Sequence, residues 1–135
     1  MVEKKIMVAG KRKTAVAKAM IKEGKGEVIY NGLPYIELRQ LHKLSLMEPI
    51  EICKKILGHF NFDIAIRTSG GGTEGQIQAA RLAVAKALVK ITGNQELRKA
   101  IVEYDRNMLV ADVRRKETRK PGDSKARAMR QTSYR

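Results

Sequence analysis

The stretch SGGGTEGQ, residues 69–76, has the residue types and spacing of an anion-binding loop. Gly70, Gly72 and Gly75 have the G-x-G-x-x-G spacing with which dinucleotide-binding folds seat a pyrophosphate at a helix N-terminus. An alternating apolar run precedes the stretch, and a run with helical periodicity follows it. A strand, a glycine turn and a helix are therefore predicted here, and a nucleotide enzyme is the first hypothesis to weigh.

Two observations oppose a nucleotide enzyme. The acidic residue about twenty positions further on, Glu96, lies in a helical pattern, whereas the dinucleotide fold needs it at the end of a second strand. Gln76 and Ile77 stand where a phosphate loop has its Lys and its Ser or Thr. We therefore predict no nucleotide cofactor and no small-molecule substrate.

The glycines then have two remaining interpretations. They make a tight turn between strand and helix, because glycine permits positive φ and close approach of another backbone. Alternatively, the turn seats an RNA phosphate at the helix N-terminus, with Arg67 and Arg81 adding positive charge nearby. The sequence leaves both open.

No other group of residues forms a recognisable active site. The two histidines, His42 and His59, have no metal-ligand spacing to the single Cys53 or to a carboxylate motif. Glu48 and Glu51 are interpreted as first-turn charges that complement a helix dipole. We predict that the chain is not an enzyme and holds neither a catalytic residue nor a metal.

Positive charge is concentrated in two segments of the chain. Residues 1–25 carry eight Lys and Arg against two Glu, and residues 114–135 carry nine against two acidic residues. The 88 residues between them have a net charge of +1, although the whole chain has +14. Charge of one sign confined to particular segments is typical of polyanion binding.

Composition indicates a single domain with an aliphatic core. The chain has 135 residues, 43% of them hydrophobic, but only 4% are aromatic and Trp is absent. No apolar run approaches the roughly 20 residues of a membrane span, and the N-terminal segment lacks the apolar stretch of a signal peptide. A lone cysteine suits a reducing compartment. We expect a soluble, cytoplasmic protein with no membrane partner.

Periodicity and turn residues predict an α/β domain. Strands are expected at 4–10, 14–24, 27–32 and 61–69, with Ala15, Ala17, Ala19 and Ile21 on one face of the second. Helices are expected after Pro34, from Pro49 to Gly58, over 73–93, and after an Asn94 N-cap. Residues 109–113 could form a short strand. The domain is predicted to span 1–112, and an extended basic tail without apolar periodicity 113–135.

RNA is the partner that the two cationic segments favour. Residues 11–14 lie in a turn between strands, and the tail spaces its Arg residues widely, with small residues between several of them. Arg contacts phosphate oxygens bidentately and stacks on bases. A tail that coats nucleic acid without specificity has the same composition and stays an alternative. The residues predicted to bind RNA are Lys11, Arg12, Lys13, Thr14, Lys18, Arg67, Gly71, Gly72, Arg81, Arg114, Arg115, Lys116, Arg119, Lys120, Lys125, Arg127 and Arg130.

Three motifs carry a family resemblance over nearly the whole chain. They are AGKRKTAVAKA near the N-terminus, SGGGTEGQIQAARLAVAKAL in the middle and DSKARAMRQTSYR at the end. In this order and spacing they resemble the universal small-subunit ribosomal protein number nine family, in its archaeal or eukaryotic form.

The resemblance implies a fold and partners. The fold would be a two-layer α/β (α+β) sandwich, a mixed sheet with helices on one face, as in the second domain of ribosomal protein S-five, plus the basic tail. The partners would be small-subunit ribosomal RNA, other proteins of the subunit head, and the peptidyl-site tRNA. Carried over, the tRNA contact falls on Ser133, Tyr134 and Arg135.

Overall fold

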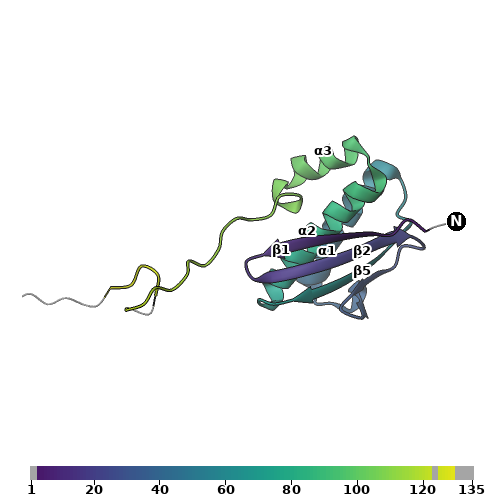
Figure 1. Cartoon of the computed structure of the whole chain (residues 1–135). Helices are drawn as coiled ribbons and strands as arrows, with labels where there is room; N and C mark the ends of the chain where they lie inside the picture. The colour runs from purple at the N-terminus through teal and green to yellow at the C-terminus, as the bar shows by residue number, and fades with distance from the viewer. Residues whose placement is uncertain (1–2, 123–124, 130–135) are drawn as a thin grey trace, which may run out of the picture.

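The computed structural model describes residues 3–122 and 125–129 and has two layers. A five-stranded sheet forms one layer, and the helices cover one of its faces (Figure 1). After the last helical turn the chain leaves the domain as an extended segment, in which residues 111–120 have no regular secondary structure (Figure 1). The fold is thus a mixed α+β domain with three α-helices and a five-stranded mixed sheet in the part that the structure describes.

The elements follow one another in an order that mixes local hairpins with one crossover. They are β1 (Ile6–Arg12), β2 (Ala15–Glu23), β3 (Val28–Tyr30), β4 (Leu33–Pro34), the 3-10 turn η1 (Tyr35–Glu37), α1 (Gln40–Leu57), β5 (Phe62–Ser69), α2 (Thr73–Thr92), α3 (Gln95–Tyr104) and the 3-10 turn η2 (Arg106–Met108). The predicted strands, the helix predicted over 73–93 and the short helix predicted after Pro34 are confirmed, with ends that differ by one or more residues. The expected strand at 109–113 is wrong, because this segment pairs with no strand.

Strand pairing brings two turns to the same end of the sheet, where β1 and β5 end and β2 begins. The order is β1-β2-β5-β3-β4, with β1–β2 and β2–β5 antiparallel and β3–β5 parallel. Arg12 pairs with Ala15 at one end of the first hairpin, and Val16 pairs with Ser69 at the end of β5. The β1–β2 turn therefore lies beside the glycine turn that leads into α2.

Small residues let α2 pack closely on β1 and β2. The predicted alternation along β2 is confirmed, and the structure shows that Ala15, Ala17, Ala19 and Ile21 form the fully buried face. The residues of α2 that are likewise fully buried include Ala79, Ala80, Ala83 and Ala87. A Cβ atom on Gly10 would lie 2.3 Å from the Ala79 carbonyl oxygen and 2.8 Å from the Ala83 amide nitrogen. Gly10 therefore sets how closely strand and helix can approach.

The prediction that a helix begins at Pro49 is wrong. Helix α1 begins at Gln40 and contains Pro49 in its interior, where the proline is buried. An interior proline removes one helical hydrogen bond and costs about 3 kcal/mol. Burial of Leu46, Ile50 and Cys53 on the same face offsets that cost. Burial also raises the pKa of the Cys53 thiol to about 11.

Two further sequence predictions concern helix ends. The Asn94 N-cap of α3 is confirmed, because its side chain accepts a 2.8 Å hydrogen bond from the Glu96 amide. Glu48 and Glu51 do not lie in a first turn, since α1 begins eight residues before the first of them. Glu51 lies 3.5 Å from Lys54 on the next turn, and Glu48 faces another helix.

A test of the close packing is Gly10→Ala. The added methyl group would overlap backbone atoms of α2 that cannot rotate away, so the helix must shift. We expect a loss of about 1–3 kcal/mol in the free energy of unfolding, measured by urea denaturation. Ala9→Ser, one position earlier and exposed, should change it by less than about 0.5 kcal/mol. Equal stability of the two variants would contradict the packing role of Gly10.

Candidate nucleic-acid interface

The glycine turn packs against the β1–β2 turn. Gly70 and Gly71 have φ of 72° and 63°, a region that side chains other than glycine rarely adopt. A Cβ on Gly70 would lie 2.6 Å from the Thr14 carbonyl oxygen, and one on Gly71 would lie 3.0 Å from the Ala15 amide nitrogen. Turn geometry and close approach thus explain these two glycines without any ligand.

The first turn of α2 borders a hollow of about 360 Å³. Gly72 caps the helix with an extended backbone and no side-chain hydrogen bond, so the first amides of α2 have no side-chain cap. Glu74 in that first turn forms a 2.8 Å contact with His42 of α1, which gives His42 a structural role. Across the hollow lie Arg12 at the end of β1 and Lys13 and Thr14 of the β1–β2 turn, together with residues of the glycine turn. The predicted turn over 11–14 is wrong at its start, because Lys11 and Arg12 pair with Val16 and Ala15 in the hairpin.

The sheet lacks the arrangement that a dinucleotide fold requires. In such folds the helix after the glycine turn leads to a second, parallel strand of the same sheet. Here α2 leads to α3, and no strand follows α2 in residues 93–122 or 125–129. The topology therefore opposes the nucleotide-enzyme hypothesis, as Glu96 does by lying inside α3.

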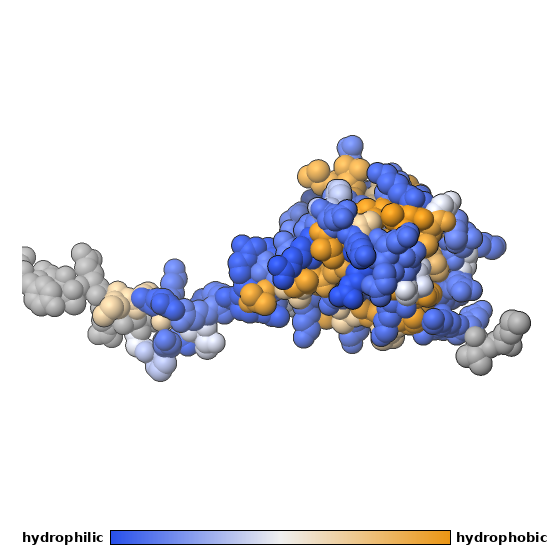
Figure 2. Space-filling view, turned by 90° about the horizontal axis from the view of Figure 1, so that it is seen from above, coloured by the Kyte–Doolittle hydropathy of each residue, from blue (hydrophilic) through white to orange (hydrophobic). Residues whose placement is uncertain are grey.

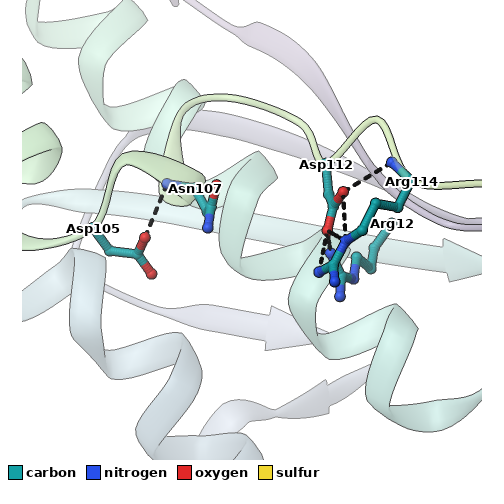
Figure 3. Close-up of polar contacts among 5 residues, drawn as sticks. All are labelled: Arg12, Asp105, Asn107, Asp112 and Arg114. Carbon is teal, nitrogen blue, oxygen red and sulfur yellow. Dashed lines mark hydrogen bonds and ion pairs between the residues drawn. The ribbon is translucent and has the colours of Figure 1, made fainter.

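The extended segment begins with residues 112–116, which we call the tail root. Asp112 holds the tail root against Arg12 at the end of β1 (Figure 3). The Asp112 carboxylate pairs with the Arg12 guanidinium and also accepts a 2.9 Å hydrogen bond from the Arg114 amide. The Arg114 guanidinium donates to the same carboxylate at 2.7–3.1 Å. One residue further, the Arg115 guanidinium donates to the Lys13 carbonyl oxygen.

These contacts place cations from opposite ends of the chain around one hollow. Its volume is about 540 Å³, and it lies between the β1–β2 turn and the root of the extended segment. The residues that line it are Lys13, Thr14, Arg114, Arg115 and Lys116. Four of these five side chains are cationic, so the hollow favours an anion.

A second group of cations lies on the open face of the sheet, on the interior strands β2 and β5. Lys18 on β2 and Arg67 on β5 stand directly opposite each other, and both are exposed. Like charges directly opposite on neighbouring strands destabilise a sheet. In the part of the chain that the structure describes, no carboxylate lies within 4.0 Å of Lys11, Lys13, Lys18 or Arg67.

Arg81 is the predicted RNA-binding residue that the structure places between helices, where it is partly buried. Its guanidinium pairs with Glu48 of α1 and, at 3.0 Å, with Asp105 between α3 and η2. The Arg81 side chain is only 18% exposed. Two carboxylates therefore already neutralise Arg81, and its position indicates a structural ion pair that joins three helical elements.

The remaining predicted residues lie along the extended segment, where hydrophilic side chains predominate (Figure 2). Lys116, Arg119, Lys120, Lys125 and Arg127 are exposed. Glu117 lies 2.8 Å from Arg127 and 3.9 Å from Lys120. The predicted contacts of Arg130, Ser133, Tyr134 and Arg135 lie outside the described residues.

Sequence reasoning missed Asp112, the acidic residue at the centre of the tail root. Its short-range signal is the D-x-R spacing to Arg114, which permits the carboxylate to accept from an amide two residues on. No sequence signal connects it to Arg12, which lies 100 residues earlier.

Among residues 3–122 and 125–129, no cluster of three His, Cys, Asp or Glu side chains could hold a metal ion. The same residues include no helix that is both long and apolar enough to cross a membrane.

Comparison with known proteins finds both a matching family model and similar individual proteins. A family model described as ribosomal protein S9/S16 matches residues 10–135. The small ribosomal subunit protein uS9 of Methanococcus vannielii is 43% identical over 136 residues, which cover 98% of this chain and 99% of the relative.

The ion pairs of Arg81 can be tested with Arg81→Met, which keeps most of the side-chain volume and removes the charge. Glu48 and Asp105 would be left without their cation, but each side chain is 33% exposed. We therefore expect a loss of about 1–3 kcal/mol in the free energy of unfolding, below the 3–5 kcal/mol of a fully buried pair. Exposed Arg98 supplies the control, since Arg98→Met should stay within about 0.5 kcal/mol. Unchanged stability with weakened RNA binding would return Arg81 to the RNA interface.

Proposed function

The chain belongs to the ribosomal protein S9/S16 family, and from this membership we propose that it is a structural constituent of the small ribosomal subunit in the cytoplasm. In that role it is a ribonucleoprotein component that acts in translation, and it has no catalytic function. Its partners are ribosomal RNA and neighbouring ribosomal proteins. The near-neutral middle of the chain supplies the folded domain, and the two cationic segments supply the charge that RNA requires.

We propose that ribosomal RNA of the subunit head binds where the β1–β2 turn, the glycine turn and the tail root meet. The observation that carries this proposal is the cationic hollow of about 540 Å³. Arg114 is already paired with Asp112, so phosphates would be contacted mainly by Lys13, Arg115 and Lys116, and RNA binding would release the counterions of those phosphates. Lys18 and Arg67 extend the interface onto the open face of the sheet, where a phosphate between them would relieve their repulsion.

The glycine turn belongs to the same interface through its backbone. The hollow of about 360 Å³ separates the first amides of α2 from Arg12, Lys13 and Thr14. Partial positive charge at a helix N-terminus attracts a phosphate, although Glu74 in the first turn reduces that attraction. We therefore assign Gly71 and Gly72 backbone contacts, and we leave Arg81 out of the interface.

The finer fold assignment and the tRNA contact rest on the resemblance of the sequence motifs. The domain, residues 1–112, is proposed to share the sandwich of the second domain of ribosomal protein S-five. Residues 113–135 are proposed to be a basic tail that reaches toward the peptidyl-site tRNA. Exposed cations at Lys116, Arg119, Lys125 and Arg127 support a tail that follows RNA over several phosphates.

The RNA interface can be tested by the salt dependence of binding to a head fragment of small-subunit ribosomal RNA. Lys13→Gln and Lys18→Gln each remove one proposed phosphate contact. Each should reduce the slope of log K against log salt concentration by about 0.7–0.9, measured by filter binding. Lys55→Gln, an exposed charge near the C-terminal end of α1, is the matched control and should leave the slope unchanged. Equal slopes in all three variants would contradict the interface, and equal affinity for unrelated RNAs would favour a nonspecific coating protein.

The tRNA contact can be tested by deleting residues 133–135. The deletion removes the cation of Arg135 that is proposed to approach the tRNA backbone, but none of the residues proposed to bind ribosomal RNA. Small subunits that carry the truncated chain should assemble normally and bind peptidyl-site tRNA more weakly, as measured by filter binding of labelled tRNA. Unchanged tRNA affinity in fully assembled subunits would remove the tRNA role.

A further inference from the structure

Asp112 is a carboxylate in the middle of a cationic surface, and RNA binding does not explain its presence there. Its side chain is only 17% exposed, and Arg12, its partner on the domain, is 22% exposed. A negative charge among phosphate-binding cations weakens the attraction for RNA. Its role must therefore come from the contacts that it makes within the protein.

Those contacts connect the extended segment to the folded domain at one point. Met108 is fully buried and Leu109 packs against the core, so the chain is fixed up to this position. Three residues later, Asp112 pairs with Arg12, and the Arg115 guanidinium donates to the Lys13 carbonyl oxygen. Among the described residues, the hydrogen bonds and ion pairs beyond Arg115 join tail residues only to one another.

The same carboxylate also shapes the tail locally. It accepts from the Arg114 amide and from the Arg114 guanidinium, so Asp112 contacts the domain on one side and the outgoing chain on the other (Figure 3). Hydrogen bonds between charged groups are stronger and shorter than neutral ones. Partial burial of Arg12 and Asp112 further protects their pair from screening by salt.

A tail without apolar periodicity cannot fix its own direction, because it buries too little surface to offset its conformational entropy. Its direction is therefore decided at the root. A root that is already held in one direction loses less conformational freedom when the tail meets its partner.

We propose that Asp112 is a positioning residue, which together with Arg12 forms a clasp that fixes the direction in which the tail leaves the domain. The clasp keeps the cations of the tail root and of the β1–β2 turn on one side of the molecule, around the hollow of about 540 Å³. That RNA is the polyanion on this side rests on the proposed function, whereas the clasp is a property of the free protein.

The clasp can be tested in free protein by electron–electron distance measurement between two spin labels. Gln95→Cys at the start of α3 and Thr118→Cys in the tail provide exposed label sites on the two sides of the clasp. The native Cys53 stays unlabelled at neutral pH, because it is buried and its thiol pKa is raised to about 11. Asp112→Asn keeps the shape of the side chain and removes its charge.

We expect Asp112→Asn to broaden the distance distribution about twofold relative to the parent. Glu117→Gln is the matched control, because it makes the same charge change within the tail but leaves the clasp intact, and its distribution should keep the parent width. Equal widths in Asp112→Asn and Glu117→Gln would overturn the proposal.

A second variant separates an effect on the direction of the tail from an effect on the stability of the fold. If Asp112→Asn lowers the melting temperature, Arg12→Gln opens the clasp from the domain side while the local Asp112–Arg114 contacts persist. Arg12→Gln should also broaden the distribution, and exposed Arg119→Gln should not. A parent-like width in Arg12→Gln would overturn the clasp.

RNA affinity distinguishes loss of the clasp from loss of folding. Two RNAs are compared, polyuridylate and the head fragment of ribosomal RNA. Asp112→Asn should keep or raise the affinity for polyuridylate, because it removes a negative charge from the interface, and its affinity for the head fragment should fall relative to polyuridylate. Unfolding of the tail root would instead lower the affinity for both RNAs together. Because the spin-label distances are measured without RNA, failure of the RNA proposal would leave the clasp standing, and the reverse also holds.

Discussion

Close packing of α2 on β1 and β2 is the constraint on which the rest of the molecule depends. The domain has few aromatic residues and builds this contact from alanines on β2 and α2 and from Gly10 on β1. Even one methyl group added to Gly10 would overlap the backbone of α2. The close contact places the N-terminus of α2 and its glycine turn against the β1–β2 turn. Because Arg12 lies at the end of β1, the same contact fixes the point where Asp112 attaches the tail root. Aliphatic packing thus positions a surface whose chemistry is ionic.

Among the described residues, one group of charged side chains is paired with carboxylates inside the domain, and another is left without a carboxylate partner on the surface proposed to bind RNA. Inside the domain, Arg81 has two carboxylate partners and joins α1 to α2 and to the chain beyond α3. On the open face of the sheet, Lys18 and Arg67 stand opposite each other without a carboxylate within 4.0 Å in the described residues, which lowers stability slightly in the free protein. Such a cost is consistent with a surface that reaches its lowest free energy only with a polyanion bound.

The sequence predicted local features well and long-range ones poorly. Alternation in β2, the long helix α2 and the Asn94 cap follow from periodicity and side-chain chemistry within a few residues, and the structure confirms them. The start of α1 was wrong because burial of Pro49 among core residues outweighs its preference for a helix start. Neither the strand order nor the pairs Arg12–Asp112 and Arg81–Glu48 could be predicted, since they depend on the arrangement of elements in space. For the same reason, proximity in sequence to the glycine turn predicts Arg81 as an RNA contact but gives no sign of its ion pairs with Glu48 and Asp105.

We propose that this chain works as a fixed part of the small ribosomal subunit, held there by its two cationic segments. Sedimentation of a cell lysate through a sucrose gradient, with detection of the chain at low salt and after a high-salt wash, tests this role. We expect the chain to stay with the small subunit through the wash, because many phosphate contacts and a folded interface act together. A peak near the mass of the free chain at both salt concentrations would contradict it.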